Sequence, residues 1–205
     1  MKKSILILIF FPFFIFAQNN KAKRILDELS KKTKSFSSIK VEFTNTFSST
    51  ITDLNESQSG TIYLKDSSYK LELESQIIIS DGETNWIYLI DEEEVNITEI
   101  DDEENELNPS KILTMYEDGY NYKFITEDSN IYQINLFPKE ISPFSKVELF
   151  INKHKMQISS FIMIDKQGSH YKYIIDSFET NIEINNDFFI FKTTEYPNID
   201  IIDLR

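Results

Sequence analysis

The chain is 205 residues long, carries a net charge of −13 and contains no cysteine. The missing cysteine excludes thiol catalysis, disulfide exchange and metal sites built on cysteine, while the acidic balance disfavours nucleic acid and anionic lipid headgroups, which both bind basic surfaces. Arginine occurs only at Arg24 and Arg205, so the paired hydrogen bonds by which arginine recognises phosphate or carboxylate are scarcely available.

The first seventeen residues have the three parts of a secretory signal peptide. Lys2 and Lys3 precede an almost unbroken apolar run from Ile5 to Phe16, and the small residue Ala17 precedes a polar stretch. The run is short for a membrane-spanning helix, which takes about 20 residues. We expect residues 1–17 to be a signal peptide cleaved near Ala17, with an uncleaved anchor as the alternative, and residues 18–205 to form a single domain.

Two helices are predicted. Residues 22–36 have apolar side chains at three- and four-residue spacing, which is typical of an amphipathic helix packed on a core. Asn108 and Pro109 have the residue types that begin a helix, and Gly119 is suited to end it.

The rest of the chain alternates apolar and polar residues, as half-buried antiparallel strands do. Turns are expected at Asp81-Gly82, at residues 152–155 and at Gln167-Gly168. Strands are expected at residues 39–47, 60–65, 69–74, 77–79, 86–90, 95–100, 122–126, 131–137, 146–151, 158–165, 171–177 and 188–191. The pattern predicts a mainly β fold, an antiparallel meander of about ten strands curled into an open or closed barrel.

Little in the sequence indicates catalysis. His154 and His170 are the only histidines, and both are expected on the surface near turns. The hydrolase, metalloprotease, EF-hand and phosphate-loop motifs are missing, so we predict no enzyme, no catalytic residue, no metal site and no cofactor. Residues 91–106 hold ten acids and no base; this segment is interpreted as a solvated loop, with a partner-docking surface or a weak calcium site as alternatives.

An apolar concavity is the remaining candidate site. Two helices need not fill the concave side of such a sheet, and an underfilled apolar concavity can hold a ligand, although core side chains alone can also fill it. The alternation places these candidate ligand-binding residues on the concave face: Phe43, Phe47, Ile62, Leu64, Leu71, Leu73, Ile77, Ile79, Trp86, Tyr88 and Ile90, joined by Leu113 and Tyr116 from the mid-chain helix.

Several segments, in order and spacing, resemble the periplasmic outer-membrane lipoprotein carrier family (LolA-like). The most specific is the hairpin from Ile79 to Tyr88, which is similar to the pattern SDGxxxWxY of the family. The others are residues 25–30, 39–43, 59–65 and 108–113.

The resemblance implies an incomplete barrel whose helices form a lid over a hydrophobic cavity for the acyl chains of lipoproteins. It also implies a periplasmic carrier, here expected to be monomeric. Such a carrier takes cargo from an inner-membrane ATP-driven exporter and surrenders it at the outer membrane, where an acceptor is possible.

One departure concerns the lid. Well-studied members carry a latch arginine soon after the strand that matches Gly60, whereas this chain has Lys65-Asp66-Ser67, with Lys65 as a weak substitute. Two other functions stay open: a lipid- or partner-sensing regulatory module of the same fold, and a glycan-active hydrolase that uses a pair of carboxylates.

Overall fold

The protein is a single large β-sheet with one long helix, as a computed structural model describes it for residues 13–49, 51, 54–100 and 119–205. The helix is α1 (Phe13–Thr33), and two short 3-10 helices follow the last long strand, η2 (Asn186–Phe189) and η3 (Thr193–Glu195). The strands are β1 (Ile39–Ser49), β2 (Leu54–Lys65), β3 (Ser68–Leu73), β4 (Gln76–Ser80), β5 (Thr84–Leu89), β6 (Glu94–Glu99), β7 (Tyr120–Glu127), β8 (Ile131–Pro138), β9 (Phe144–Asn152), β10 (Gln157–Asp165), β11 (His170–Thr180) and β12 (Asp200–Asp203).

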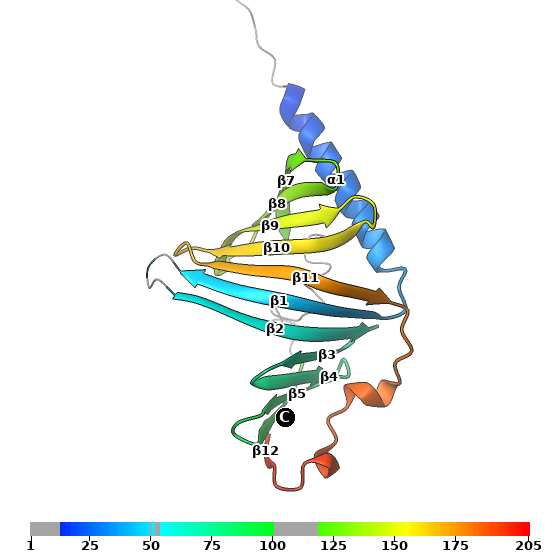
Figure 1. Cartoon of the computed structure of the whole chain (residues 1–205), viewed down its shortest axis with the longest axis vertical. Coiled ribbons are helices and arrows are strands. Elements are labelled where there is room, and N and C mark those ends of the chain that lie inside the picture. The colour runs from blue at the N-terminus through cyan, green and yellow to red at the C-terminus, as the bar shows by residue number, and fades with distance from the viewer. Residues whose placement is uncertain (1–12, 50, 52–53, 101–118) are drawn as a thin grey trace, which may run out of the picture.

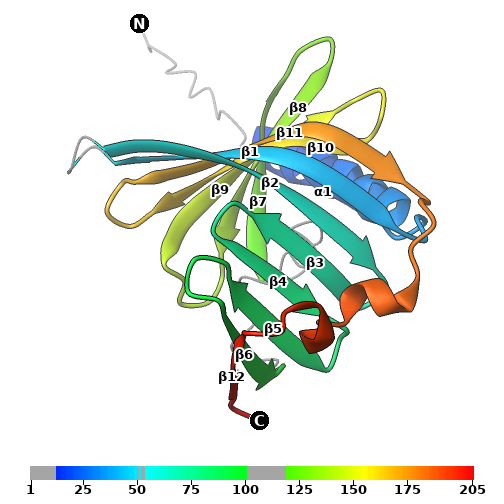
Figure 2. The same cartoon turned by 60° about the horizontal axis from the view of Figure 1, so that its bottom comes forward.

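The twelve strands lie in the order β12-β6-β5-β4-β3-β2-β1-β11-β10-β9-β8-β7. Neighbouring strands are antiparallel except β12, which runs parallel to β6. The sheet is strongly twisted and does not close, because β12 and β7 end it on opposite sides (Figures 1 and 2). The predicted fold class, a mainly β incomplete barrel, is therefore confirmed. The predicted mid-chain helix after Asn108 lies outside the described residues.

Helix α1 differs from its prediction at both ends. It is helical from Phe13, nine residues before the predicted start. It ends at Thr33, before the serine-rich sequence Ser35-Phe36-Ser37-Ser38, and the Ser35 hydroxyl donates to the Lys32 carbonyl oxygen at 2.6 Å. The helix therefore passes through the predicted cleavage site at Ala17, and cleavage stays a prediction. No helix within the described ranges is both long and apolar enough to span a membrane.

The larger core lies between α1 and one face of the sheet, which we call the helix face. The helix contributes Ala22, Ile25, Leu26 and Leu29, all at most 6% exposed. Against them pack the alternate residues of β1, β2 and β8–β10, including Val41, Ile62, Ile134, Leu136, Val147, Leu149 and Phe161. The three-to-four residue spacing of the helix and the two-residue spacing of the strands thus meet in one apolar layer.

A second core lies on the opposite face, which we call the outer face. There the C-terminal segment, residues 181–205, crosses β3–β6 and buries Phe189 and Phe191 against Ile79, Tyr88 and Val95. Figure 2 shows this segment passing from the end of β11 over the β3–β5 region toward β12. The prediction of a strand at residues 188–191 is wrong. The apolar run has the composition of a strand, but its first two residues belong to η2 and the run packs on the outer face without joining the sheet.

The hairpin turn at Asp81-Gly82 is confirmed, and its hydrogen bonds explain the residues. The Asp81 carboxylate accepts from the backbone N–H groups of Glu83 and Thr84 at 2.9 and 2.8 Å, which mimics a backbone turn. Gly82 has φ +100°, a conformation that favours glycine. The predicted turns between β9 and β10 and between β10 and β11 are also present.

Candidate functional site

The helix face holds six of the predicted ligand-binding residues. Pairing places Phe43 opposite Gly60 and Ile62 opposite Leu71, so alternate residues of β1, β2 and β3 share this face. The six are Phe43, Phe47, Ile62, Leu64, Leu71 and Leu73, and all are buried or half-buried. Their common placement agrees with the alternation argument, and their role in binding stays a prediction.

Five other predicted residues do not share that face. Pairing joins Ile79 to Trp86 and Trp86 to Ile97, so these side chains lie on the outer face. The five that belong to or pack against the outer core are Ile77, Ile79, Trp86, Tyr88 and Ile90. The expectation of one shared concave face is thus corrected, because the C-terminal segment makes both faces of β4 and β5 apolar and alternation alone cannot tell them apart.

The helix-face residues of β4 and β5 were not predicted. They are Ile78 and Ile87, which pairing connects with Leu71 of β3, and Leu89, two residues after Ile87 on the same face; each is half-buried. The signal was hidden because Ile77, Ile78 and Ile79 are identical neighbours, so the sequence offers no contrast between faces. Leu113 and Tyr116 lie outside the described residues.

Aromatic rings line the helix face where β1, β10 and β11 meet. Phe161 stacks on Tyr173 with ring centroids 4.6 Å apart, and Phe43 lies 5.8 Å from the same Tyr173 ring. Phe47 and Tyr171 form the next pair, 5.0 Å apart. Burial raises the pKa of the Tyr173 hydroxyl, because it disfavours the charged form.

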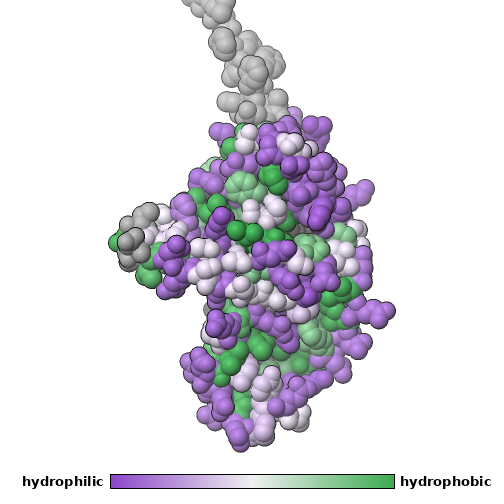
Figure 3. Space-filling view, in the orientation of Figure 1, coloured by the Kyte–Doolittle hydropathy of each residue, from purple (hydrophilic) through white to green (hydrophobic). Residues whose placement is uncertain are grey.

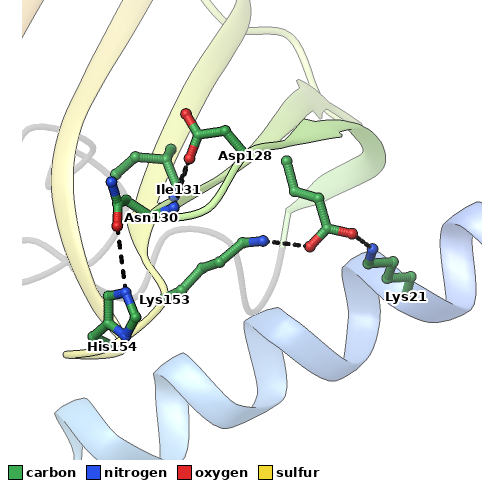
Figure 4. A network of polar contacts seen from close by, with 7 residues as sticks. Lys21, Asp128, Asn130, Ile131, Lys153 and His154 are labelled. Carbon is green, nitrogen blue, oxygen red and sulfur yellow. Dashed lines mark hydrogen bonds and ion pairs between the residues drawn. The ribbon is translucent and has the colours of Figure 1, made fainter.

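Polar contacts hold the N-terminal part of α1 to the strands beside it. Glu127 of β7 pairs with Lys21 of α1 and, at 2.5 Å, with Lys153 of the β9–β10 turn (Figure 4). The Lys21 ammonium also lies 4.3 Å from the centroid of the Phe124 ring, and the Lys153 ammonium lies 4.5 Å from that of Tyr132. Both lysines lower the pKa of the Glu127 carboxyl group, and the hydrogen bond from Lys153 has the larger effect.

Lys65 lies on the outer face, where it binds the C-terminal segment. Its ammonium donates to the Ile184 carbonyl oxygen at 2.7 Å and to the Asn186 side-chain oxygen at 2.9 Å. The residue considered as a substitute for the latch arginine therefore holds a different segment in place, on the other side of the sheet.

The polar residues offer little catalytic chemistry. His154 and His170 are exposed, as predicted, and the His154 ring contacts the Asn130 side-chain oxygen at 3.3 Å. Among the described residues, no three histidine or acidic side chains are placed to hold a metal ion. An open groove of about 650 Å³ lies beside β2, with Phe43 and Leu73 as its apolar lining and otherwise polar residues and glycine.

Comparisons with known proteins agree with this architecture. The chain is similar to an uncharacterized conserved protein from Thermus thermophilus, with 11% identity and a TM-score of 0.60 over 89% of this chain and 99% of that chain. MucB is similar at 13% identity and a TM-score of 0.50, over 84% of this chain and 63% of that one. A LolA-superfamily protein from Nitrosomonas europaea matches at 12% identity and a TM-score of 0.48, over 83% and 97%.

Sequence comparison is more specific. None of the curated protein sequences matches the chain. The family model described as outer membrane lipoprotein carrier protein LolA, however, matches residues 34–192, from the end of α1 to the C-terminal segment. This match spans well over half of the chain and includes the strands that form both faces. The chain therefore belongs to the LolA family of outer membrane lipoprotein carrier proteins.

Proposed function

We propose that this protein is a non-enzymatic periplasmic carrier that binds the acyl chains of lipoproteins on the helix face of its sheet. After cleavage near Ala17, the exported chain receives its cargo from an inner-membrane ATP-driven exporter. It then carries the cargo across the periplasm and releases it at the outer membrane. The family membership supports the carrier role, and the distribution of apolar side chains supports the choice of face.

The observation that carries this proposal is a row of half-buried apolar side chains on the helix face of β3–β5. The half-buried side chains of Leu71, Leu73 and Ile78 extend the helix-side core toward Ile87 and Leu89. Helix α1 lies toward the other half of the sheet, where β7 is the strand nearest to it (Figure 1). Apolar side chains therefore line the sheet beyond the reach of the helix, where a flexible hydrocarbon chain finds many contacts.

The energetics of acyl chains explain why such a surface is useful. Burial of one CH₂ group is worth about 0.8 kcal/mol, so a single long chain contributes on the order of 10 kcal/mol. The acyl chains of a lipoprotein in water therefore need an apolar binding surface, yet the carrier must also release them. A carrier whose own segments compete for the apolar surface has a lower net affinity, which permits release.

Native mass spectrometry of the protein purified from periplasm tests the ligand class. We expect masses that correspond to bound lipoprotein or to its acylated N-terminal peptide. Bound phospholipid alone would contradict the proposed cargo. A bound protein without acyl chains would favour the sensing module over the carrier.

Substitutions on the two faces test the choice of surface. Leu73→Glu introduces a charge on the helix face and is expected to weaken binding of a dansyl-labelled fatty acid by at least tenfold, about 1.4 kcal/mol. Ile174→Glu is the matched control, because Ile174 is 39% exposed and is not part of either core. Equal binding by both variants, with both folded by circular dichroism, would refute the assignment of the helix face.

A further inference from the structure

Strand β2 is longer than its neighbour β3, and this difference leaves an open strand edge. β2 pairs with β1 from Leu54 to Leu64, whereas its pairing with β3 begins only at Gly60. Residues 54–59 are all exposed, and no described strand lies beside them on the side away from β1. Figure 1 shows the β1–β2 hairpin reaching beyond the ends of β3 and β4.

An open edge of this kind presents backbone N–H and C=O groups that have no ladder partner. Natural edge strands are commonly protected by lysine, proline or a bulge. Residues 54–59 have the sequence Leu-Asn-Glu-Ser-Gln-Ser, which contains neither lysine nor proline and has Glu56 as its one charged residue, and the pairing of β2 with β1 has no register shift. The edge is therefore straight and accessible to another extended chain.

The 650 Å³ groove begins where this unpaired edge meets the end of β3. Ser57–Ser59 of the edge line it, and so do the first paired residues of the two strands, Gly60 and Thr61 of β2 with Glu72–Glu74 at the end of β3. Phe43 of β1 also lines the groove, because Gly60 has no side chain to cover its ring. In Figure 3 the molecular surface is hollowed below the projecting hairpin. The groove occupies the position that β3 would fill if it were longer.

The charge of the groove indicates which chain would bind. Glu42, Glu72, Glu74 and Asp176 line it, and no lysine or arginine does. Lys40 and Lys70 pair with Glu42 and Glu72 from outside the groove, each at 2.8 Å, which leaves a net negative lining. Basic side chains on an incoming strand would meet complementary charge, whereas a second copy of this acidic chain would not.

We propose that the open edge of β2 binds an extended, lysine- or arginine-containing segment of a partner protein by β-strand addition. The backbone of the segment pairs with residues 54–59, which supplies affinity, and its basic side chains face the carboxylates, which supplies selectivity. This interaction uses backbone groups and charge, so it does not depend on acyl-chain binding at the helix face.

Fluorescence anisotropy with labelled octapeptides tests the proposal. The first probe alternates lysine with valine, the second replaces each lysine by glutamate, and the third is the lysine peptide with alternate backbone nitrogens methylated. We expect the lysine peptide to bind at least tenfold more tightly than either of the other two. Equal binding of the lysine and glutamate peptides, or no effect of methylation, would overturn strand addition with charge selection.

Two further measurements locate the contact. Amide hydrogen exchange followed by NMR is expected to slow within residues 54–59 when the lysine peptide is added, and unchanged exchange there would overturn the proposed site. Glu74→Lys is expected to weaken the lysine peptide about tenfold, while Glu140→Lys, on the exposed β8–β9 connection, leaves it unchanged. Dansyl fatty acid binding should be the same in both variants, which separates this site from the acyl-binding face.

A dimer is the competing outcome. If residues 54–59 instead pair with a second copy of the chain, sedimentation velocity would show a dimer that the lysine peptide does not dissociate. That result would overturn the proposed partner.

Discussion

Gly60 allows β1, β2 and β3 to pack closely on the helix face. A Cβ atom at this position would lie 2.6 Å from the Phe43 Cζ atom and 2.7 Å from the Leu73 Cδ2 atom, both closer than real contacts permit. The absent side chain therefore lets the Phe43 ring and Leu73 approach each other across β2. The same glycine leaves the Phe43 ring open to the groove beside β2.

Gly60→Val should lower the free energy of unfolding by about 1–3 kcal/mol, because the added atoms displace a buried ring and force strain into the core. Urea denaturation monitored by circular dichroism measures the change. The neighbouring exposed residue provides the control, and Ser59→Ala should shift the midpoint far less. A Gly60→Val protein with the wild-type midpoint would show that the core adapts freely at this position.

At the scale of elements, α1 and the C-terminal segment cover opposite faces of the sheet, and each has its own polar attachment. The α1 attachment depends on the Glu127 carboxylate, whose pKa is lowered by Lys153 and Lys21. A carboxyl group whose pKa is lower in the folded state stabilises the fold fully above its unfolded pKa, about 4.3 for glutamate. That stabilisation is lost as the pH falls through the lower, folded value.

Glu127→Gln removes this pH-dependent contribution. We expect the wild type to exceed the variant in stability at pH 7, and the difference to shrink as the pH falls below about 4. Urea midpoints measured from pH 7 to pH 3 check the trend, with Glu140→Gln as the variant for an exposed glutamate elsewhere. If the difference in stability between the wild type and Glu127→Gln stayed constant over this pH range, the carboxylate charge would not be its cause.

The attachment of the C-terminal segment depends on Lys65. Its two hydrogen bonds hold Ile184 and Asn186 immediately before the aromatic residues of η2. Lys65→Met should cost about 1–3 kcal/mol, since both charge-assisted hydrogen bonds are lost at a half-buried site. Limited proteolysis should then cut faster within residues 182–192, and Lys166→Met, at an exposed turn, should leave the cleavage rate unchanged.

Element by element, the sequence predicts the regular strands well because their alternation has a clear physical cause. Strands such as residues 39–47 and 146–151 bury every second residue and leave the residues between them more exposed, and this contrast marks them. Alternation fails as a guide where the contrast disappears. The Phe188–Phe191 run has apolar residues in succession and forms η2, and the exposed strand β12 has no buried side chain to reveal it.

At the scale of the whole molecule, the sheet has two separate apolar surfaces. The candidate site could be predicted for β1–β3, where only the helix face is apolar, as Val41, Ile62 and Leu71 show. It could not be predicted for β4 and β5, because the side chains of Ile79 and Trp86 face a cover formed by residues more than ninety positions later. Which face of β4 and β5 lies on the side of α1 is set by strand pairing and by the C-terminal cover, and the residues of the two strands alone do not reveal it.

The two surfaces can be observed independently through Trp86, the only tryptophan. Its side chain packs against the outer core, so an acyl ligand on the helix face should leave its emission maximum unchanged. Lys65→Met, which loosens the C-terminal segment, should shift the emission to longer wavelength as the ring becomes wetter. A shift caused by a dansyl-free fatty acid in the wild type would place the ligand on the outer face instead.

The central position of β1 has a consequence for how the chain reaches its native state. Ile39 of β1 pairs with Leu64 of β2 on one side and with Thr180 of β11 on the other. β1 is synthesised first, so its second edge can pair only after β11, the last long strand, has been made. Pairing between such distant segments carries a large loop-closure cost and slows folding. Until β11 is complete, one edge of β1 therefore has no strand to pair with, and the two halves of the sheet cannot yet join.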